Sequence, residues 1–190
     1  MNGKSKELDA NEQGELISKL IMKMKVEEGK DFYLVSSKWW SSFTSFSNYQ
    51  YYIQKLEGTE ERDQPPKNSN AEKPSKIDNT DLVLESNKLK PRLAEYQNYN
   101  LLTKEAWDKL MEWYGDEDTI VICRKGVQII SQNRNRLTIE IYPLHLNIFE
   151  RLKMNYAPKI LQISKSKKIS DLIDKICQIY FIPRHKSKLW

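Results

Sequence analysis

The most regular pattern of apolar and polar positions lies in residues 101–115, LLTKEAWDKLMEWYG. Thr103 is a good N-cap residue at the start of this run, and Gly115 follows it where a helix commonly ends. Between them, apolar side chains recur three and four residues apart, at Trp107, Leu110, Met111 and Tyr114. The segment therefore predicts an amphipathic helix whose apolar face needs a partner surface.

Two more helices are predicted upstream. Residues 12–26 carry apolar side chains at helical spacing, and the sequence Glu-Glu-Gly at 27–29 ends that run. The next helix begins at Ser36 or Ser37 and is rich in aromatic residues. Two of its rings lie four residues apart and so share one face, which we expect to pack on the later helix. The predicted core consists of Trp39, Phe43, Trp107, Leu110, Met111 and Tyr114.

Short strands are predicted between and after these helices. Residues 32–35, 99–102 and 119–123 are β-prone runs. Lys125-Gly126 is predicted to form a turn, and residues 88–93 a weak helix. Helices mixed with short strands indicate an α+β fold with a small antiparallel sheet.

A different order of elements is predicted in the last third of the chain. Residues 137–144 alternate apolar and polar side chains, as a half-buried strand does, and residues 160–163 form another short apolar run. An amphipathic helix follows from Ile169 to Tyr180, and Pro183 stops it. Strand, strand and helix leave one sheet edge and one helix face without partners.

These patterns divide the chain into two units. We expect a disordered N-terminus over 1–11, a first domain over 12–126, a linker over 127–136 and a second unit over 137–190. Within the first domain, residues 57–76 are polar, contain three prolines and show no periodicity. Such a composition buries little surface, so we expect a mobile loop insertion there.

Charge is distributed unevenly along the 190 residues. Residues 151–190 carry ten Lys or Arg and only two Asp or Glu, whereas the net charge of the whole chain is +5. Mean hydropathy is −0.72, no apolar run approaches the length of about 20 residues that spans a bilayer, and the N-terminus lacks the apolar core of a signal peptide. We therefore expect a monomeric protein of the cytoplasm, the nucleus or both, without membrane partners.

The chain contains few residues suited to metal or covalent chemistry. Its two cysteines, Cys123 and Cys177, are too few for a disulfide framework and form no CxxC pair, so we expect neither a metal nor a cofactor. Cys123 lies in a β-prone run and Cys177 on an apolar helix face, where a free cysteine usually packs as a small apolar residue. His145 and His185 are expected at the surface, and we expect no catalysis by this chain.

Three separated blocks resemble one known family. They are YLVSSKWW at 33–40, IDNTDL at 77–82 and YNLLTKEAWDKLMEWYG at 99–115, in this order. They resemble the DUSP domain of ubiquitin-specific proteases over about residues 12–126. The resemblance implies a tripod-like fold of three helices that support a small antiparallel sheet.

The second unit is similar to the ubiquitin-like domain that follows DUSP in tandem deubiquitinases. The similarity implies an incomplete β-grasp of two strands and a helix, with a tail in which Ile182, Pro183, Leu189 and Trp190 match. In the DUSP part, the family's Pro-Gly-Pro-Ile loop is here Pro74-Ser75-Lys76-Ile77, so the glycine and the second proline are replaced.

The resemblance implies a function without catalysis. We expect a protein-interaction or regulatory segment of a ubiquitin-specific cysteine protease whose catalytic domain is absent from this chain, with partners in the ubiquitin system. The candidate contact residues are Tyr33, Trp40, Ile77, Asp78 and Asn79. The alternative to partner contact is a structural role. Ile77 would then fill the core beneath the loop, and Asp78 and Asn79 would hold the turn.

The other class considered is a basic nucleic-acid-binding protein. Four tryptophans could stack on bases, and the basic C-terminal third could hold phosphates. The tryptophans have the spacing of core residues, however, and the basic run at 165–168 has the character of a hairpin tip. We therefore rank nucleic acid below protein as a partner.

Overall fold

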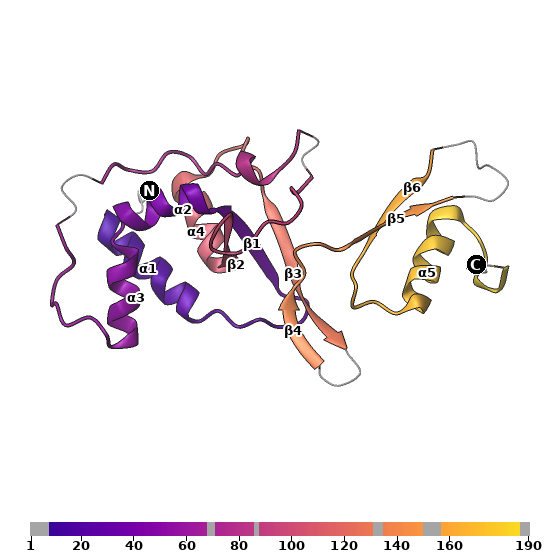
Figure 1. Cartoon of the computed structure of the whole chain (residues 1–190), viewed down its shortest axis with the longest axis horizontal. Coiled ribbons are helices and arrows are strands. Elements are labelled where there is room, and N and C mark those ends of the chain that lie inside the picture. Colours follow the sequence, from indigo (N-terminus) through magenta and orange to yellow (C-terminus); the bar gives the residue numbers. More distant parts are fainter. Residues whose placement is uncertain (1–7, 68–70, 86–87, 131–134, 150–156, 187–190) are drawn as a thin grey trace, which may run out of the picture. The chain divides into compact units, whose positions relative to one another are not determined.

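The computed structural model describes residues 8–67, 71–85, 88–130, 135–149 and 157–186. Contacts between Cα atoms divide the chain into two compact units (Figure 1). The first comprises the residues up to Lys25 together with Lys30–Arg124. The second comprises Val26–Gly29 and the residues from Lys125 onward.

Four α-helices lie in the described part of the first unit: α1 (Ala10–Met22), α2 (Ser37–Phe46), α3 (Tyr49–Glu57) and α4 (Lys104–Tyr114). A capping box of Asp9 and Glu12 starts α1, so this helix begins two residues earlier than expected. The helix α3 was not predicted. Asn48 separates it from α2 by adopting a left-handed conformation with φ of 53°, which asparagine tolerates better than most residues.

Two strands of the first unit pair in antiparallel fashion. They are β1 (Asp31–Ser36) and β2 (Tyr99–Thr103), with Leu34 opposite Leu101. The longer β3 (Ile122–Ile130) pairs with β4 (Asn135–Ile139), and the sheet order is β2-β1-β3-β4. The short 3₁₀ helix η1 (Thr80–Leu82) precedes β2. The predicted α+β class with an antiparallel sheet is confirmed.

Aromatic rings from α2 and α4 form the core of the first unit. Trp39 stacks on Phe43 with a centroid distance of 5.8 Å, and the edge of Tyr114 meets Trp39 at 5.6 Å. Trp107 and Leu110 are buried in the same cluster, whereas Met111 is half-buried against it. Each large buried side chain stabilises the fold by about 2 kcal/mol.

The helix α1 lies side by side with α3 (Figure 1) and makes a very close approach at its second turn. A Cβ atom built on Gly14 would lie 1.9 Å from the carbonyl oxygen of Ser47. Glycine is therefore required at this crossing, because any side chain there would push α1 away from the α2–α3 junction.

Two predicted elements of the sequence analysis are wrong. Lys125-Gly126 is not a turn but lies inside β3, where the Gly126 carbonyl accepts a hydrogen bond from the Gly29 amide at 2.9 Å. The described residues among 88–93 form no helix. Leu89 instead bridges to Val83, and Pro91 disfavours helical backbone in the residue before it.

The predicted strand over 137–144 is also wrong as a single strand. Its first part belongs to β4, and Leu137 pairs with Gln128 of β3. Its last residue begins β5 (Leu144–Ile148) after a bend at 141–142. The segment expected as a linker, 127–136, accordingly contributes its described residues to β3 and β4.

The second unit contains most of β3 and the strand β4, followed by a further hairpin and a helix. In that hairpin β5 pairs with β6 (Lys159–Ile163) in antiparallel fashion, and α5 (Ile169–Tyr180) follows. This hairpin and helix bury Leu161, Ile163 and Cys177, and the Tyr180 hydroxyl donates a hydrogen bond to the Ile148 carbonyl at 3.3 Å. After α5 comes the short helix η3 (Arg184–Lys186), and the matching tail residues Leu189 and Trp190 fall outside the described residues.

The described residues of the expected loop insertion, 57–67 and 71–76, contain no helix or strand except the end of α3 at Glu57. Side-chain donors nevertheless attach its backbone to the helices. Tyr51 donates to the Arg62 carbonyl at 3.1 Å, Asn48 to the Pro66 carbonyl at 3.1 Å, and Trp39 to the Ser75 carbonyl at 2.9 Å. The loop therefore follows a defined path at these points.

Candidate protein-interaction site

The carboxamide of Asn79 connects three segments in the interior of the first unit. It accepts a hydrogen bond from the Ser36 amide at 2.8 Å and donates to the carbonyls of Leu34 at 3.2 Å and Ile120 at 2.9 Å. Its side chain is only 1% exposed. Asn79 thus holds the turn before η1 against β1 and the segment that leads into β3, and it offers no contact surface.

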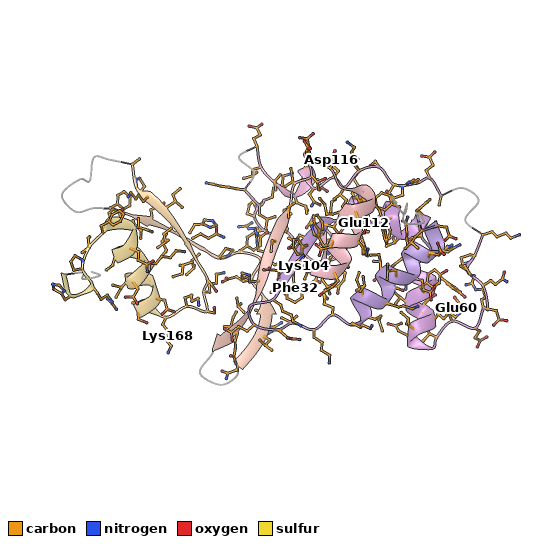
Figure 2. All side chains as sticks on the ribbon, turned by 180° about the vertical axis from the view of Figure 1, so that it is seen from behind. Phe32, Glu60, Lys104, Glu112, Asp116 and Lys168 are labelled. Carbon is orange, nitrogen blue, oxygen red and sulfur yellow. The ribbon has the colours of Figure 1, made fainter. Side chains whose placement is uncertain are left out.

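Ile77 is also inside the fold, at 5% exposure. Its backbone amide donates to the Tyr114 carbonyl at 2.9 Å, so the end of α4 fixes this turn. A second attachment is the ion pair between the exposed Lys76 and Asp116. Asp116 lies just beyond α4 and is labelled in Figure 2. The pKa of the Asp116 carboxyl is lowered, and the largest cause is the hydrogen bond that the Lys76 ammonium donates to it.

Asp78 is the exposed residue between these two buried ones. Its carboxylate accepts hydrogen bonds from the Thr80 hydroxyl at 2.6 Å and the Thr80 amide at 2.9 Å. Those bonds, with a smaller contribution from the charge of Lys38, lower the pKa of Asp78. Asp78 therefore presents a fixed negative charge at the surface of the turn.

Tyr33 is half-buried on β1. Its ring stacks on Trp107 at a centroid distance of 5.3 Å with an interplanar angle of 6°. Burial raises the pKa of its phenol, as does the neighbouring Cys123 thiol, while the nearby Lys104 ammonium lowers it. Lys104 is labelled at the start of α4 in Figure 2. Tyr33 is thus partly exposed while its ring is held against the core.

Trp40, expected as a contact residue, is mostly buried with 9% exposure. Its ring packs on Phe43 and meets Tyr49 edge-on at 5.2 Å. The exposed remainder of Trp40 lines an open groove of about 830 Å³ between α2, α3 and the loop insertion. We call this the Trp40 groove; its other lining residues include Tyr49, Tyr51, Gln54, Glu60 and Arg62.

The five candidate residues therefore do not form one exposed surface. Ile77 and Asn79 are core and turn residues, Asp78 and part of Tyr33 are accessible, and Trp40 belongs to the separate groove. Sequence reasoning missed Tyr49 and Arg62, because their shared groove depends on the unpredicted α3. The Tyr-Gln-Tyr-Tyr sequence at 49–52 was the available signal.

The two cysteines and two histidines lie on four different elements. Among the described residues, no group of three or more His, Cys, Asp or Glu side chains is arranged to hold a metal ion. The Cys177 thiol is buried on α5, and Cys123 lies beside Tyr33. His145 on β5 and His185 in η3 are both exposed.

The tryptophan rings that could stack on bases are occupied within the fold. Trp39 and Trp107 are 5% and 3% exposed, and their faces pack on Phe43 and Tyr33 respectively. Base stacking on these two rings would require the core to open. Within the described residues, moreover, no helix has the length and apolar character to span a bilayer.

The DUSP domain family matches residues 29–127. The chain belongs to this family, and the resemblance noted for the three sequence blocks is confirmed over that range.

The chain is also similar to ubiquitin-specific proteases. It is 29% identical to ubiquitin carboxyl-terminal hydrolase 5 of Arabidopsis thaliana over 86% of this chain and 18% of the relative. It is 29% identical to inactive ubiquitin-specific protease 5 of Oryza sativa subsp. japonica over 98% of this chain and 50% of the relative.

For human ubiquitin carboxyl-terminal hydrolase 15, the identity is 28% over 90% of this chain and 16% of the relative. The chain therefore spans half or less of the length of each of these three relatives.

Proposed function

We propose that this chain is a non-catalytic protein-interaction and regulatory segment of a ubiquitin-specific cysteine protease. The match to the DUSP domain family carries the proposal, because that family is found in such proteases. The names of its relatives support the same pathway, and one of them is called inactive. On this proposal, the partners are proteins of the ubiquitin system.

The proposed lack of catalysis is supported by the surroundings of the cysteines. A cysteine protease needs a thiolate beside a histidine base that a third group orients. Cys177 is buried, and the Tyr33 phenol lies beside Cys123. A phenol does not serve as a general base at neutral pH, since its ordinary pKa is about 10.

A fluorogenic ubiquitin substrate tests this part of the proposal. We expect the purified chain to release no fluorophore above the rate of a buffer control. The Cys123→Ala and Cys177→Ala variants, measured alongside, should give the same background rate. Turnover by the unmodified chain that either substitution abolishes would reject the non-catalytic role.

We further propose that the second unit is part of a ubiquitin-like domain. The order β5, β6, α5 is the order in which a β-grasp fold begins, and it supports this assignment. The proposed domain would start near Leu144, since the residues of β4 pair with β3. Nuclear magnetic resonance of the full chain tests it: nuclear Overhauser contacts between α5 and the faces of β5 and β6 are expected, and a helix detached from the hairpin would contradict it.

The interaction role itself is tested by affinity capture. The tagged chain, incubated in a eukaryotic cell extract, should enrich proteins of the ubiquitin system over a tag-only control. Asp78→Lys reverses an exposed charge without removing a core contact, whereas Tyr33→Ala removes a partly exposed ring that also stacks on Trp107. Reduced capture by either folded variant would assign the contact, whereas enrichment equal to the control for the unmodified chain would reject the role.

A further inference from the structure

The Trp40 groove contains hydrogen-bond donors that the fold does not use. Within the described residues, neither the Trp40 indole N–H nor the Tyr49 hydroxyl has a hydrogen-bond partner. Tyr49 is half-buried and Trp40 is 9% exposed, and both residues line the groove. A ligand in the groove therefore meets the accessible parts of these two side chains.

The two rings also form a rigid apolar corner. Trp40 and Tyr49 meet edge-on at an interplanar angle of 71°, and the Trp40 ring also packs against Phe43. Aromatic corners that carry N–H and O–H donors suit polyproline II segments. Such segments present apolar proline rings and outward carbonyl oxygens, and they are already extended before binding.

The chain itself places prolines against this part of the surface. Pro66 lines the groove, and its carbonyl accepts the hydrogen bond from the Asn48 carboxamide. The neighbouring Pro65 lies with Pro66 in a second hollow beside Phe46. A side-chain amide on this surface thus already donates a hydrogen bond to the carbonyl of a proline. A proline-rich ligand would make the same kind of contact.

Charge at the rim indicates the chemistry of the ligand's flanking residues. Glu60, labelled in Figure 2, pairs with Arg62 at 3.0 Å, so these two charges offset each other. Lys67 also lines the groove, is exposed, and makes no ion pair within the described residues. A ligand carboxylate would complement this positive charge.

A further aromatic ring lies close to the groove. The phenol of Tyr96 is one of the neighbours that raise the pKa of Tyr49 to about 12, after burial as the main cause. Tyr96 is 78% exposed and has a positive φ of 66°, an unfavourable conformation for a tyrosine. Such strained residues cluster at binding sites.

We propose that the Trp40 groove binds a proline-rich extended peptide that carries carboxylate side chains. The proline rings pack on Tyr49 and on the exposed part of Trp40, peptide carbonyls accept from the indole N–H and the phenol O–H, and a carboxylate meets Lys67. This inference rests on the proposed interaction role and names the chemistry of one partner.

Fluorescence anisotropy with the full chain tests the proposal. The probe is a fluorescein-labelled peptide of sequence APPEPPEPA. Two matched peptides replace every proline by alanine or every glutamate by lysine. We expect saturable binding of the probe and binding at least about tenfold weaker for both matched peptides. Equal binding of all three, or none by the probe, would overturn the proposal.

Variants locate the contact. Tyr49→Phe keeps the ring and removes the donor, so affinity should fall about fivefold, as expected for one hydrogen bond. Tyr52→Phe is the control on the same helix, outside the groove lining, and should leave affinity unchanged. Lys67→Glu should weaken the glutamate peptide and strengthen the lysine peptide. An unchanged affinity in both Tyr49→Phe and Lys67→Glu would place the peptide elsewhere and reject the groove.

A direct readout uses the indole N–H resonances in ¹H–¹⁵N spectra. The Trp40 signal, assigned from a Trp40→Phe sample, should shift on titration, whereas the Trp107 signal should not. A shift confined to other indoles would contradict the proposal. Capture of ubiquitin-system proteins without peptide binding would reject this groove alone, whereas failure of both experiments would reject the interaction role as well.

Discussion

At the scale of single residues, hydrogen-bonding side chains define the turn and the loop more than apolar contacts do. Asn79 joins β1, the turn before η1 and the segment before β3 through three hydrogen bonds. In the sequence it was one of several turn-forming residues. Its burial could not be foreseen, because its partners lie more than 40 positions away.

Replacing Asn79 by leucine should destabilise the first unit strongly. The substitution keeps the branched shape of the side chain but leaves the Ser36 amide and two carbonyls without their partner, and an unpaired buried group costs about 1–3 kcal/mol. Urea unfolding followed by circular dichroism should show a loss of at least about 2 kcal/mol. Asp78→Ala, the exposed neighbour, is the control and should cost less than about 1 kcal/mol. Equal effects of both changes would contradict the role given to Asn79.

Tyr49 should make the stability sensitive to alkaline pH. Burial raises the pKa of its phenol from 10.0 to about 12 in the folded chain. Because the folded state holds this proton more tightly, its stabilising contribution is complete below pH 10 and is lost between about pH 10 and 12. Unfolding free energies measured from pH 8 to 11.5 should fall less steeply for Tyr49→Phe than for the unmodified chain. Parallel curves would refute the assignment.

At the scale of elements, the helix at 104–114 was predictable because its cap, its apolar stripe and its final glycine all agree. The separation of α2 from α3 was not, since it depends on the backbone of one residue, Asn48. The pairing of β4 with β3 also escaped sequence reasoning. The residues of β4 alternate well enough to continue into β5, and only the hairpin pairing with β3 decides where the first strand ends.

The two tryptophans of α4 should differ in their contribution to stability. Trp107 is 3% exposed and stacks on Tyr33, whereas Trp113 is half-buried at the edge of the core. Trp107→Ala should cost about 3–5 kcal/mol, as large truncations in a core do, and should unfold the unit at moderate temperature. Trp113→Ala is the matched control and should cost clearly less in the same thermal melts. Similar melting curves for the two variants would remove Trp107 from the core.

At the scale of the whole molecule, the two units differ in how much apolar surface they bury. Most of the buried apolar side chains lie in the first unit, whereas the described residues of the second unit bury Val127, Leu161, Ile163 and Cys177. Fold class and family were accessible from sequence because three local blocks carry them. The candidate site was less accessible, since burial removed Ile77 and Asn79 from the expected surface.

Amide hydrogen exchange should therefore be uneven along the chain. Exchange protection increases with the stability of the local cooperative unit, and that stability depends on buried apolar area. Mass spectrometry should find amides of β1, β2 and α4 protected for much longer than those of β5, β6 and α5. Equal protection in both sets would mean that the whole chain unfolds as a single cooperative unit.

The distribution of tryptophan has a practical consequence for such measurements. Four of the five indoles belong to residues 39–113, and three of these four are buried. Intrinsic emission therefore reports mainly on the solvation of the first unit, while a backbone signal averages over every helix and strand. On heating, the red shift of tryptophan emission can be compared with the loss of ellipticity. If the two changes occur at different temperatures, the two units melt separately, and no added label is needed to see it.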